Sequence, residues 1–135
     1  DERSDDIFGQ IERLPVVLSI RDLWVENICA TESVFVLIDE DTTGWGYLGE
    51  DLASLIADEM APGQMVEAYQ RCMPAYYRGF SEFAEAPPVG ENCVHELMLV
   101  MFGYRLIEWY QFAKSPDAKA LYLQVLQKIY EIGAR

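Results

Sequence analysis

The sequence predicts a mainly α protein that folds as one compact domain over residues 1–135, with five to six helices and room for one short strand or hairpin near residues 34–48. Three observations support this fold class. A chain of 135 residues has the length of a single domain. Its composition, 51% hydrophobic and 24% charged, is typical of a globular protein. Apolar residues recur at spacings of three and four, the period of a helix with one buried face.

The front part of the chain is predicted to be helical, with one ambiguous stretch. Residues 1–6 form a flexible, solvated lead-in, and an amphipathic turn follows over residues 7–14. Ser19 stands where a helix N-cap would, with Asp22 three residues later, and apolar residues follow at helical spacing. The apolar run 34–38 fits either a buried strand or the last turns of this helix. We favour the helix.

Four further segments show clearer helical patterns. A short helix is expected within residues 48–60, and a longer one over 65–83, where Pro74 should introduce a kink. The segment 93–113 is apolar almost all round the helical circumference, which indicates a helix surrounded by others at the centre of the core. A serine followed by proline then starts a final helix over residues 115–133.

The charge is strongly asymmetric along the chain. The formal net charge is −13, and residues 1–60 hold 15 Asp and Glu against 3 Arg. This balance argues against direct binding of nucleic acid, because contacts to phosphate depend on Lys and Arg. It favours a basic protein partner, which the negative field would attract.

Cysteine usage and hydropathy indicate a soluble, cytoplasmic protein. Cys29, Cys72 and Cys93 are odd in number, show no C-x-x-C spacing and have apolar neighbours, so we expect buried free thiols. No apolar run reaches the roughly 18 residues that a membrane-spanning helix needs, so no membrane association is expected.

The stretch Asp39–Glu50, DEDTTGWGYLGE, satisfies two incompatible patterns. Gly44, Gly46 and Gly49 spell G-x-G-x-x-G, which cradles phosphate when it joins a strand to a helix within a parallel sheet. The sequence shows no further strands for such a sheet, and the neighbouring carboxylates would repel an anion. The phosphate interpretation is therefore rejected.

The same stretch resembles the calcium-binding loop of the EF-hand family. The resemblance implies side-chain oxygens from Asp39, Asp41 and Thr43, the backbone carbonyl of Trp45 and two oxygens of Glu50. The chain holds no second loop of this kind, whereas EF-hands normally stabilise one another in pairs. We predict an acidic, glycine-rich connection and no cofactor, and keep a calcium-binding module as the alternative.

No catalytic set is recognisable. His95 is the only histidine, and no Ser-His-Asp, G-x-S-x-G, H-E-x-x-H or Walker pattern is present. A series of aromatic residues from Tyr69 to Tyr122 is explained first by core packing, and its alternative use is a pocket in a helical small-ligand binder or enzyme. We predict a protein that is not an enzyme.

These observations together predict a non-enzymatic acidic binding protein that docks on and neutralises a basic protein. An immunity or inhibitor protein against a nuclease or a nucleic-acid-binding complex has this character. Carboxylates at the interface would imitate phosphates, and aromatic side chains would act as buried anchors. The predicted partner-binding residues are Asp22, Glu26, Asp39, Glu40, Asp41, Glu50, Asp51, Asp58, Trp24, Trp45 and Tyr47.

Overall fold

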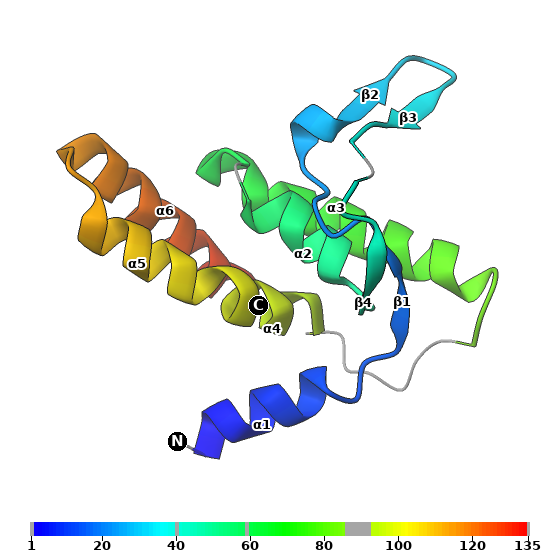
Figure 1. The fold of residues 1–135 in the computed structure, drawn as a ribbon, viewed down its shortest axis with the longest axis horizontal. Helices are drawn as coiled ribbons and strands as arrows, with labels where there is room; N and C mark the ends of the chain where they lie inside the picture. The colour runs from blue at the N-terminus through cyan, green and yellow to red at the C-terminus, as the bar shows by residue number, and fades with distance from the viewer. Residues whose placement is uncertain (1, 40, 59, 86–92, 135) are drawn as a thin grey trace.

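The computed structural model describes residues 2–39, 41–58, 60–85 and 93–134. It is mainly helical, with two small antiparallel sheets of two strands each in the described part of the chain (Figure 1). The prediction of a mainly α fold is confirmed, but the β content is larger than the single strand or hairpin that was expected. The helices are α1 (Glu2–Ile11), α2 (Glu50–Ala57), α3 (Pro62–Ser81), α4 (Cys93–Met98), α5 (Tyr104–Phe112) and α6 (Pro116–Gly133).

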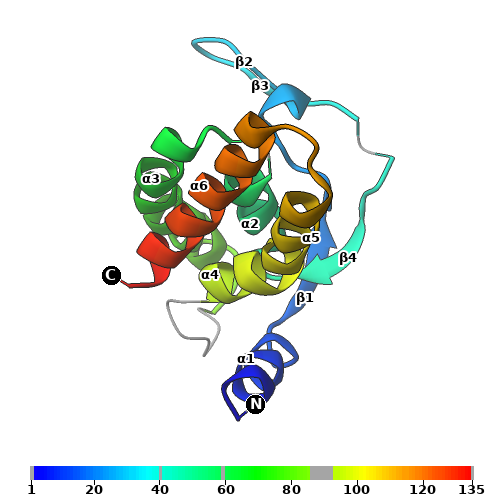
Figure 2. The ribbon, with the colours of Figure 1, turned by 90° about the vertical axis from the view of Figure 1, so that its left-hand side faces the viewer.

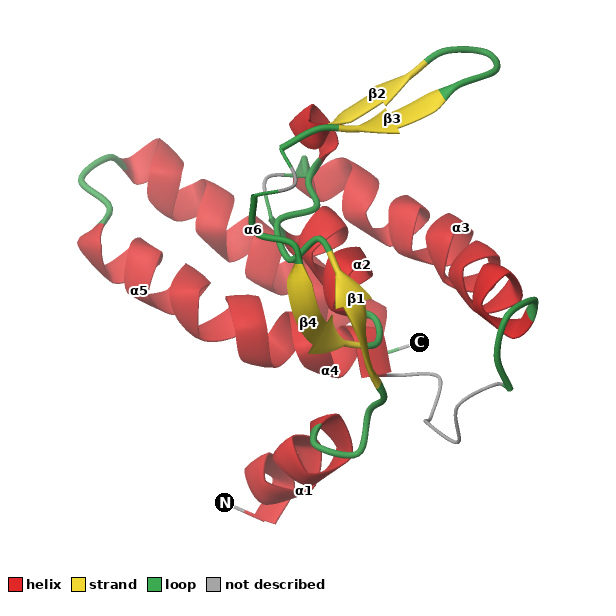
Figure 3. Ribbon diagram, turned by 45° about the vertical axis from the view of Figure 1, so that its right-hand side comes forward, coloured by secondary structure: helices red, strands yellow, loops and turns green. Residues whose placement is uncertain are grey.

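The strands form two separate ribbons. In the first, β1 (Val16–Ser19) pairs with β4 (Gly44–Tyr47), and Leu18 stands opposite Trp45. In the second, β2 (Ile28–Ala30) pairs with β3 (Phe35–Leu37) to make a hairpin. This hairpin projects away from the helices, at the opposite end of the molecule from α1 (Figures 2 and 3).

The core is centred on α4. Val94, Leu97 and Met98 are at most 1% exposed, and the helix packs against α1, α2 and α6. The prediction of a central helix is therefore correct for the first half of the segment 93–113. In the second half, α5 buries Leu106 but leaves Tyr104, Ile107 and Phe112 more than half exposed. A five-residue π-helical segment, Leu99–Gly103, separates the two halves.

The predicted helix starting at Ser19 is wrong. Ser19 belongs to β1 and is 2% exposed, and its hydroxyl donates to Asp51 Oδ1 at 2.7 Å instead of capping a helix. A 3₁₀ turn (Val25–Asn27) and the β2–β3 hairpin occupy residues 25–37. The apolar run 34–38 is too short for its period to separate strand from helix.

The remaining helix predictions agree better with the structure. The patterns at 48–60, 65–83 and 115–133 correspond to α2, α3 and α6, with Pro74 inside α3. Ser115 is the N-cap of α6 as predicted, and its hydroxyl accepts a hydrogen bond from the Ala118 backbone N–H at 3.1 Å. At the front, α1 begins at Glu2, so most of the predicted lead-in is helical.

The turn between β4 and α2 depends on Gly49. Its φ of 97° lies in the left-handed region, and an added Cβ would stand 2.9 Å from Val94 Cγ2. Glycine is therefore required for both the conformation and the close approach to α4. This turn sets the start of α2 and with it the positions of Glu50 and Asp51.

Two other sequence expectations are tested by the structure. The thiols are free, but only Cys93 is buried, whereas Cys72 is half-buried and Cys29 is exposed on β2. The expectation that all three are buried is therefore wrong for Cys29, because β2 lies on a ribbon outside the core. None of the helices in the described residues has the length and apolar character needed to cross a membrane.

Candidate functional site

Two of the predicted partner-binding acids lie in an internal network at the start of α2. Asp51 accepts hydrogen bonds from the Ser19 hydroxyl at 2.7 Å and from the backbone N–H groups of Arg21 at 2.9 Å and Ile20 at 3.1 Å. Glu50 accepts from the Tyr47 N–H at 2.9 Å and lies 3.8 Å from Arg21 Nε. These contacts join β1 and β4 to the N-terminus of α2, where negative charge is favoured by the helix dipole.

The acids of the front half do not form one continuous surface. Asp6 and Glu12 lie on or just after α1, at the opposite end of the molecule from the hairpin (Figure 1). The largest group lies on residues 22–43, which we call the arm. This segment contains six acidic residues and no Lys or Arg. Within it Glu26, Asp39 and Asp41 are exposed and Asp22 is half-buried.

The arm also exposes a large apolar surface. Val25 and Phe35 are 56% and 63% exposed, although both are residue types that normally favour a core. The other apolar residues of the arm with large exposed fractions are Val34, Val36 and Ile38. Glu40, a further predicted residue, lies outside the described residues. The arm therefore combines carboxylates with unpacked β-branched and aromatic side chains.

The three predicted aromatic anchors have different environments. Trp45 is 74% exposed on β4 beside Leu18, which is 69% exposed on β1. Tyr47 is half-buried and packs against the core. Trp24 is also half-buried, and its buried indole Nε1 has no hydrogen-bond partner among the described residues. Only Trp45 and its neighbours present an open apolar face.

The residues of the alternative calcium loop are not arranged as an EF-hand. Gly44–Tyr47 is a strand paired with β1, so Trp45 lies in a ladder instead of a loop. Glu50 already interacts with the Tyr47 N–H and with Arg21. Asp39, Asp41 and Thr43 are exposed, and no group of three or more His, Cys, Asp or Glu residues with metal-binding geometry occurs among the described residues.

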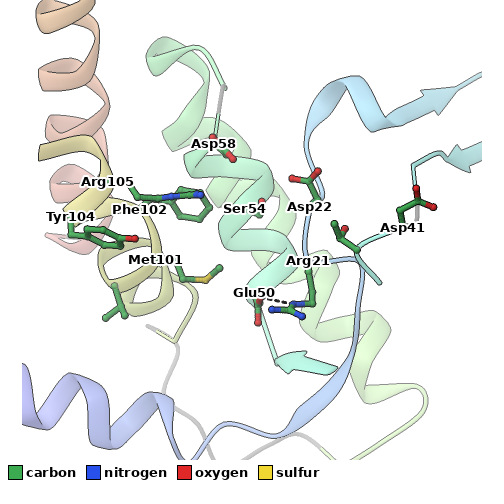
Figure 4. Close-up of a pocket in the computed structure, with 12 residues that line it drawn as sticks. Arg21, Asp22, Asp41, Glu50, Ser54, Asp58, Met101, Phe102, Tyr104 and Arg105 are labelled. Carbon is green, nitrogen blue, oxygen red and sulfur yellow. Dashed lines mark ion pairs between the residues drawn. The ribbon is translucent and has the colours of Figure 1, made fainter. Parts of the chain in front are cut away.

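A cleft of about 800 Å³ lies between the base of the arm and the helices α2 and α5 (Figure 4). It collects four of the predicted residues, Asp22, Asp41, Glu50 and Asp58, which come from separate parts of the sequence. Two arginines also line this cleft, Arg21 at the base of the arm and Arg105 on α5. The lining of the cleft is therefore acidic, and the two arginines offset part of its negative charge.

Arg105 was not identified from the sequence. Its guanidinium carbon lies 5.8 Å from the ring centre of Phe102 and 5.7 Å from that of Trp109. The sequence did contain a signal for this arrangement. Phe102 precedes Arg105 by three residues and Trp109 follows it by four, so on a helix the arginine lies between the two rings. Arg105 is the only Lys or Arg between Cys93 and Ala113.

Asp58 is the most unusual ionisable group of this region. It is the C-cap of α2, where its backbone N–H donates to the Ser54 carbonyl. Burial raises the pKa of Asp58, the nearby Arg105 lowers it, and Asp22 raises it further. A carboxylate at the C-terminal end of a helix is also disfavoured by the helix dipole.

No known protein family and no curated protein matches this sequence.

Proposed function

We propose that this protein is a non-enzymatic binding protein that docks on a basic protein through the arm. The observation that carries the proposal is the composition of the arm: six acidic residues and no Lys or Arg within it, next to exposed Val25, Phe35 and Val36. Unpacked apolar residues on a projecting hairpin are a hazard for aggregation unless a partner covers them. The absence of Lys and Arg from the arm selects a partner with cationic character.

The two surface chemistries have separate roles in this proposal. The carboxylates accelerate the encounter with a cationic surface and orient the arm on it. The apolar strand residues then lose water against the partner and slow dissociation. The nucleic-acid-binding surface of a nuclease or a similar protein is cationic because it must contact phosphates. An inhibitor or immunity role, in which the arm covers that surface, fits this chemistry.

The first test removes charge from the arm and leaves the helical body unchanged. The tagged protein is used to capture partners from a lysate of its native host, and the captured basic protein is then titrated in purified form. The arm variant carries Glu26→Gln, Glu32→Gln, Asp39→Asn and Asp41→Asn. The matched control loses the same number of exposed charges elsewhere, through Glu82→Gln, Glu85→Gln, Glu108→Gln and Asp117→Asn.

We expect the arm variant to weaken binding by about tenfold or more, the range of electrostatic steering. The control should bind like the wild type. The affinity of the wild type for the basic partner should also decrease as the salt concentration is raised from about 0.01 to 0.15 M. Over this range the Debye length falls from roughly 30 to 8 Å, so attraction between the two charged surfaces is screened. Equal losses in both variants, or an affinity independent of salt, would show that the arm is not the docking surface.

A further inference from the structure

A second cavity lies on the helical body, beside the cleft at the base of the arm. It has a volume of about 460 Å³, is partly open to solvent, and is bordered by the α2–α3 corner on one side and the α5–α6 pair on the other. The walls include Met60, Leu106, Trp109, Tyr122 and Val125. This volume lies within the range of roughly 300–1,000 Å³ that is typical of small-molecule sites.

Asp58 is the only ionisable acid or base among the described residues that line this cavity, apart from the phenol of Tyr122. Its carboxylate has no hydrogen bond or ion pair within the described part of the chain. Arg105 lines the neighbouring cleft, where its guanidinium lies over the rings of Phe102 and Trp109, and its charge acts on Asp58 from that side. Among the described residues that line the cavity there is no Lys or Arg, so a cation bound there would be the first to contact the carboxylate of Asp58 directly.

We propose that this cavity binds a small primary amine with an apolar body, whose ammonium group pairs with Asp58. The apolar walls would hold the body of the ligand, and the rings of Trp109 and Tyr122, whose centres are 5.8 Å apart, form an aromatic corner for it. A partly desolvated carboxylate gains more from a cation than an exposed one does, because water competes less. A neutral ligand would gain nothing from the charge of Asp58, and an anionic ligand would be repelled by it.

The inference is independent of the arm. Asp58 is the C-cap of α2 and the two aromatic residues belong to α5 and α6, whereas the docking surface proposed above consists of residues 22–43. Loss of partner binding in the arm variant would leave the cavity unchanged. Failure of the cavity to bind amines would equally leave the docking proposal untouched.

The test uses three probes of the same shape and different charge on the full chain. These are 4-phenylbutylamine, 4-phenylbutanol and 4-phenylbutyrate, titrated at neutral pH and followed by calorimetry and by the indole N–H resonances. We expect the amine to bind most tightly and to shift the Trp109 resonance but not that of Trp45, which is exposed on β4.

Asp58→Asn should weaken amine binding by about tenfold. Glu108→Gln, an exposed charge on α5, should leave it unchanged.

Three results would overturn the proposal. One is no binding of the amine up to about millimolar concentration. Another is equal affinity for the amine and the alcohol in the wild type, a comparison that does not depend on any variant folding. The third is an Asp58→Asn protein that binds the amine as the wild type does.

Discussion

At the scale of single residues, Asp58 and Asp51 show how differently two carboxylates of one short helix are used. Asp51, near the N-terminus of α2, accepts three hydrogen bonds and is favoured by the helix dipole. Asp58, at the opposite end, has no such bonds among the described residues and faces the negative end of the dipole. The first carboxylate stabilises the fold, and the second costs stability.

The position of Asp58 predicts a specific pH dependence of stability. Burial raises its pKa above the usual value of 3.8, with Arg105 opposing the shift and Asp22 adding to it. The folded state therefore holds the proton more tightly than the unfolded state, and the contribution of Asp58 to stability falls as the pH rises from 3.8 through the raised pKa. Asp58→Asn should remove this loss and stabilise the protein at neutral pH.

The expected gain in the free energy of unfolding for Asp58→Asn is small, from a few tenths to about 1 kcal/mol, because solvent screens the charge of Asp58. Urea unfolding of the wild type and of Asp58→Asn at a series of pH values measures it. The gain should shrink as the pH approaches 4 and the wild-type carboxyl becomes protonated. A variant that is less stable than the wild type at neutral pH would contradict this account of Asp58.

At the scale of elements, α2 is connected to β1 mainly through Asp51. The Ser19 hydroxyl and the backbone N–H groups of Ile20 and Arg21 all donate to its carboxylate. Arg21 has a φ of 66°, in the left-handed region that a non-glycine residue adopts only when its surroundings hold it there. The carboxylate therefore fixes the direction in which the chain leaves β1 and enters the arm.

Substitution of Asp51 by alanine should consequently destabilise the whole fold. Three donors would lose a charged acceptor, including the hydroxyl of Ser19, which is only 2% exposed. We expect the free energy of unfolding to fall by about 2–3 kcal/mol in urea denaturation. Glu26→Ala, a carboxylate exposed on the arm, is the control and should change it by less than about 0.5 kcal/mol. Equal effects of the two changes would refute the structural role of Asp51.

At the scale of the whole molecule, the arm and the helical body are expected to be separable. The buried core consists of α1–α6 residues together with Leu14 and Phe102, and no residue of β2 or β3 belongs to it. The backbone N–H of Ile38 donates to the carbonyl of Asn27 at 3.0 Å, so the two ends of the hairpin lie side by side. A short linker can therefore replace the hairpin without disturbing the flanking chain.

We predict that replacing residues 28–37 by Gly-Gly leaves the helical body folded. The far-UV circular dichroism should keep its helical signal, and the free energy of unfolding should change by less than about 1 kcal/mol. Binding of the basic partner should be lost, because Phe35 and Val36 leave with the hairpin. A shortened protein that is unfolded, or one that still binds the partner with full affinity, would contradict the division into arm and body.

The helical patterns show how much of the fold was predictable. The cap at Ser115 and the spacing along α6 identify that helix without any tertiary information, because a capped amphipathic face is a local property. Ser19 has the same local appearance but serves a different purpose. Its partner, Asp51, is 32 residues away, and no local rule can indicate such a contact.

The sequence by itself determined the charge, the helical majority and the lack of bases in the arm, since these follow from composition and from periodicity along the chain. The tertiary structure alone decided which acids are exposed. It placed Glu50 and Asp51 in an internal network and brought Asp22, Asp41 and Asp58 together around one cleft with Arg105. The physical reason is that the surroundings of a carboxylate are set by segments distant in sequence, and these surroundings determine whether it stabilises the fold or remains available for binding.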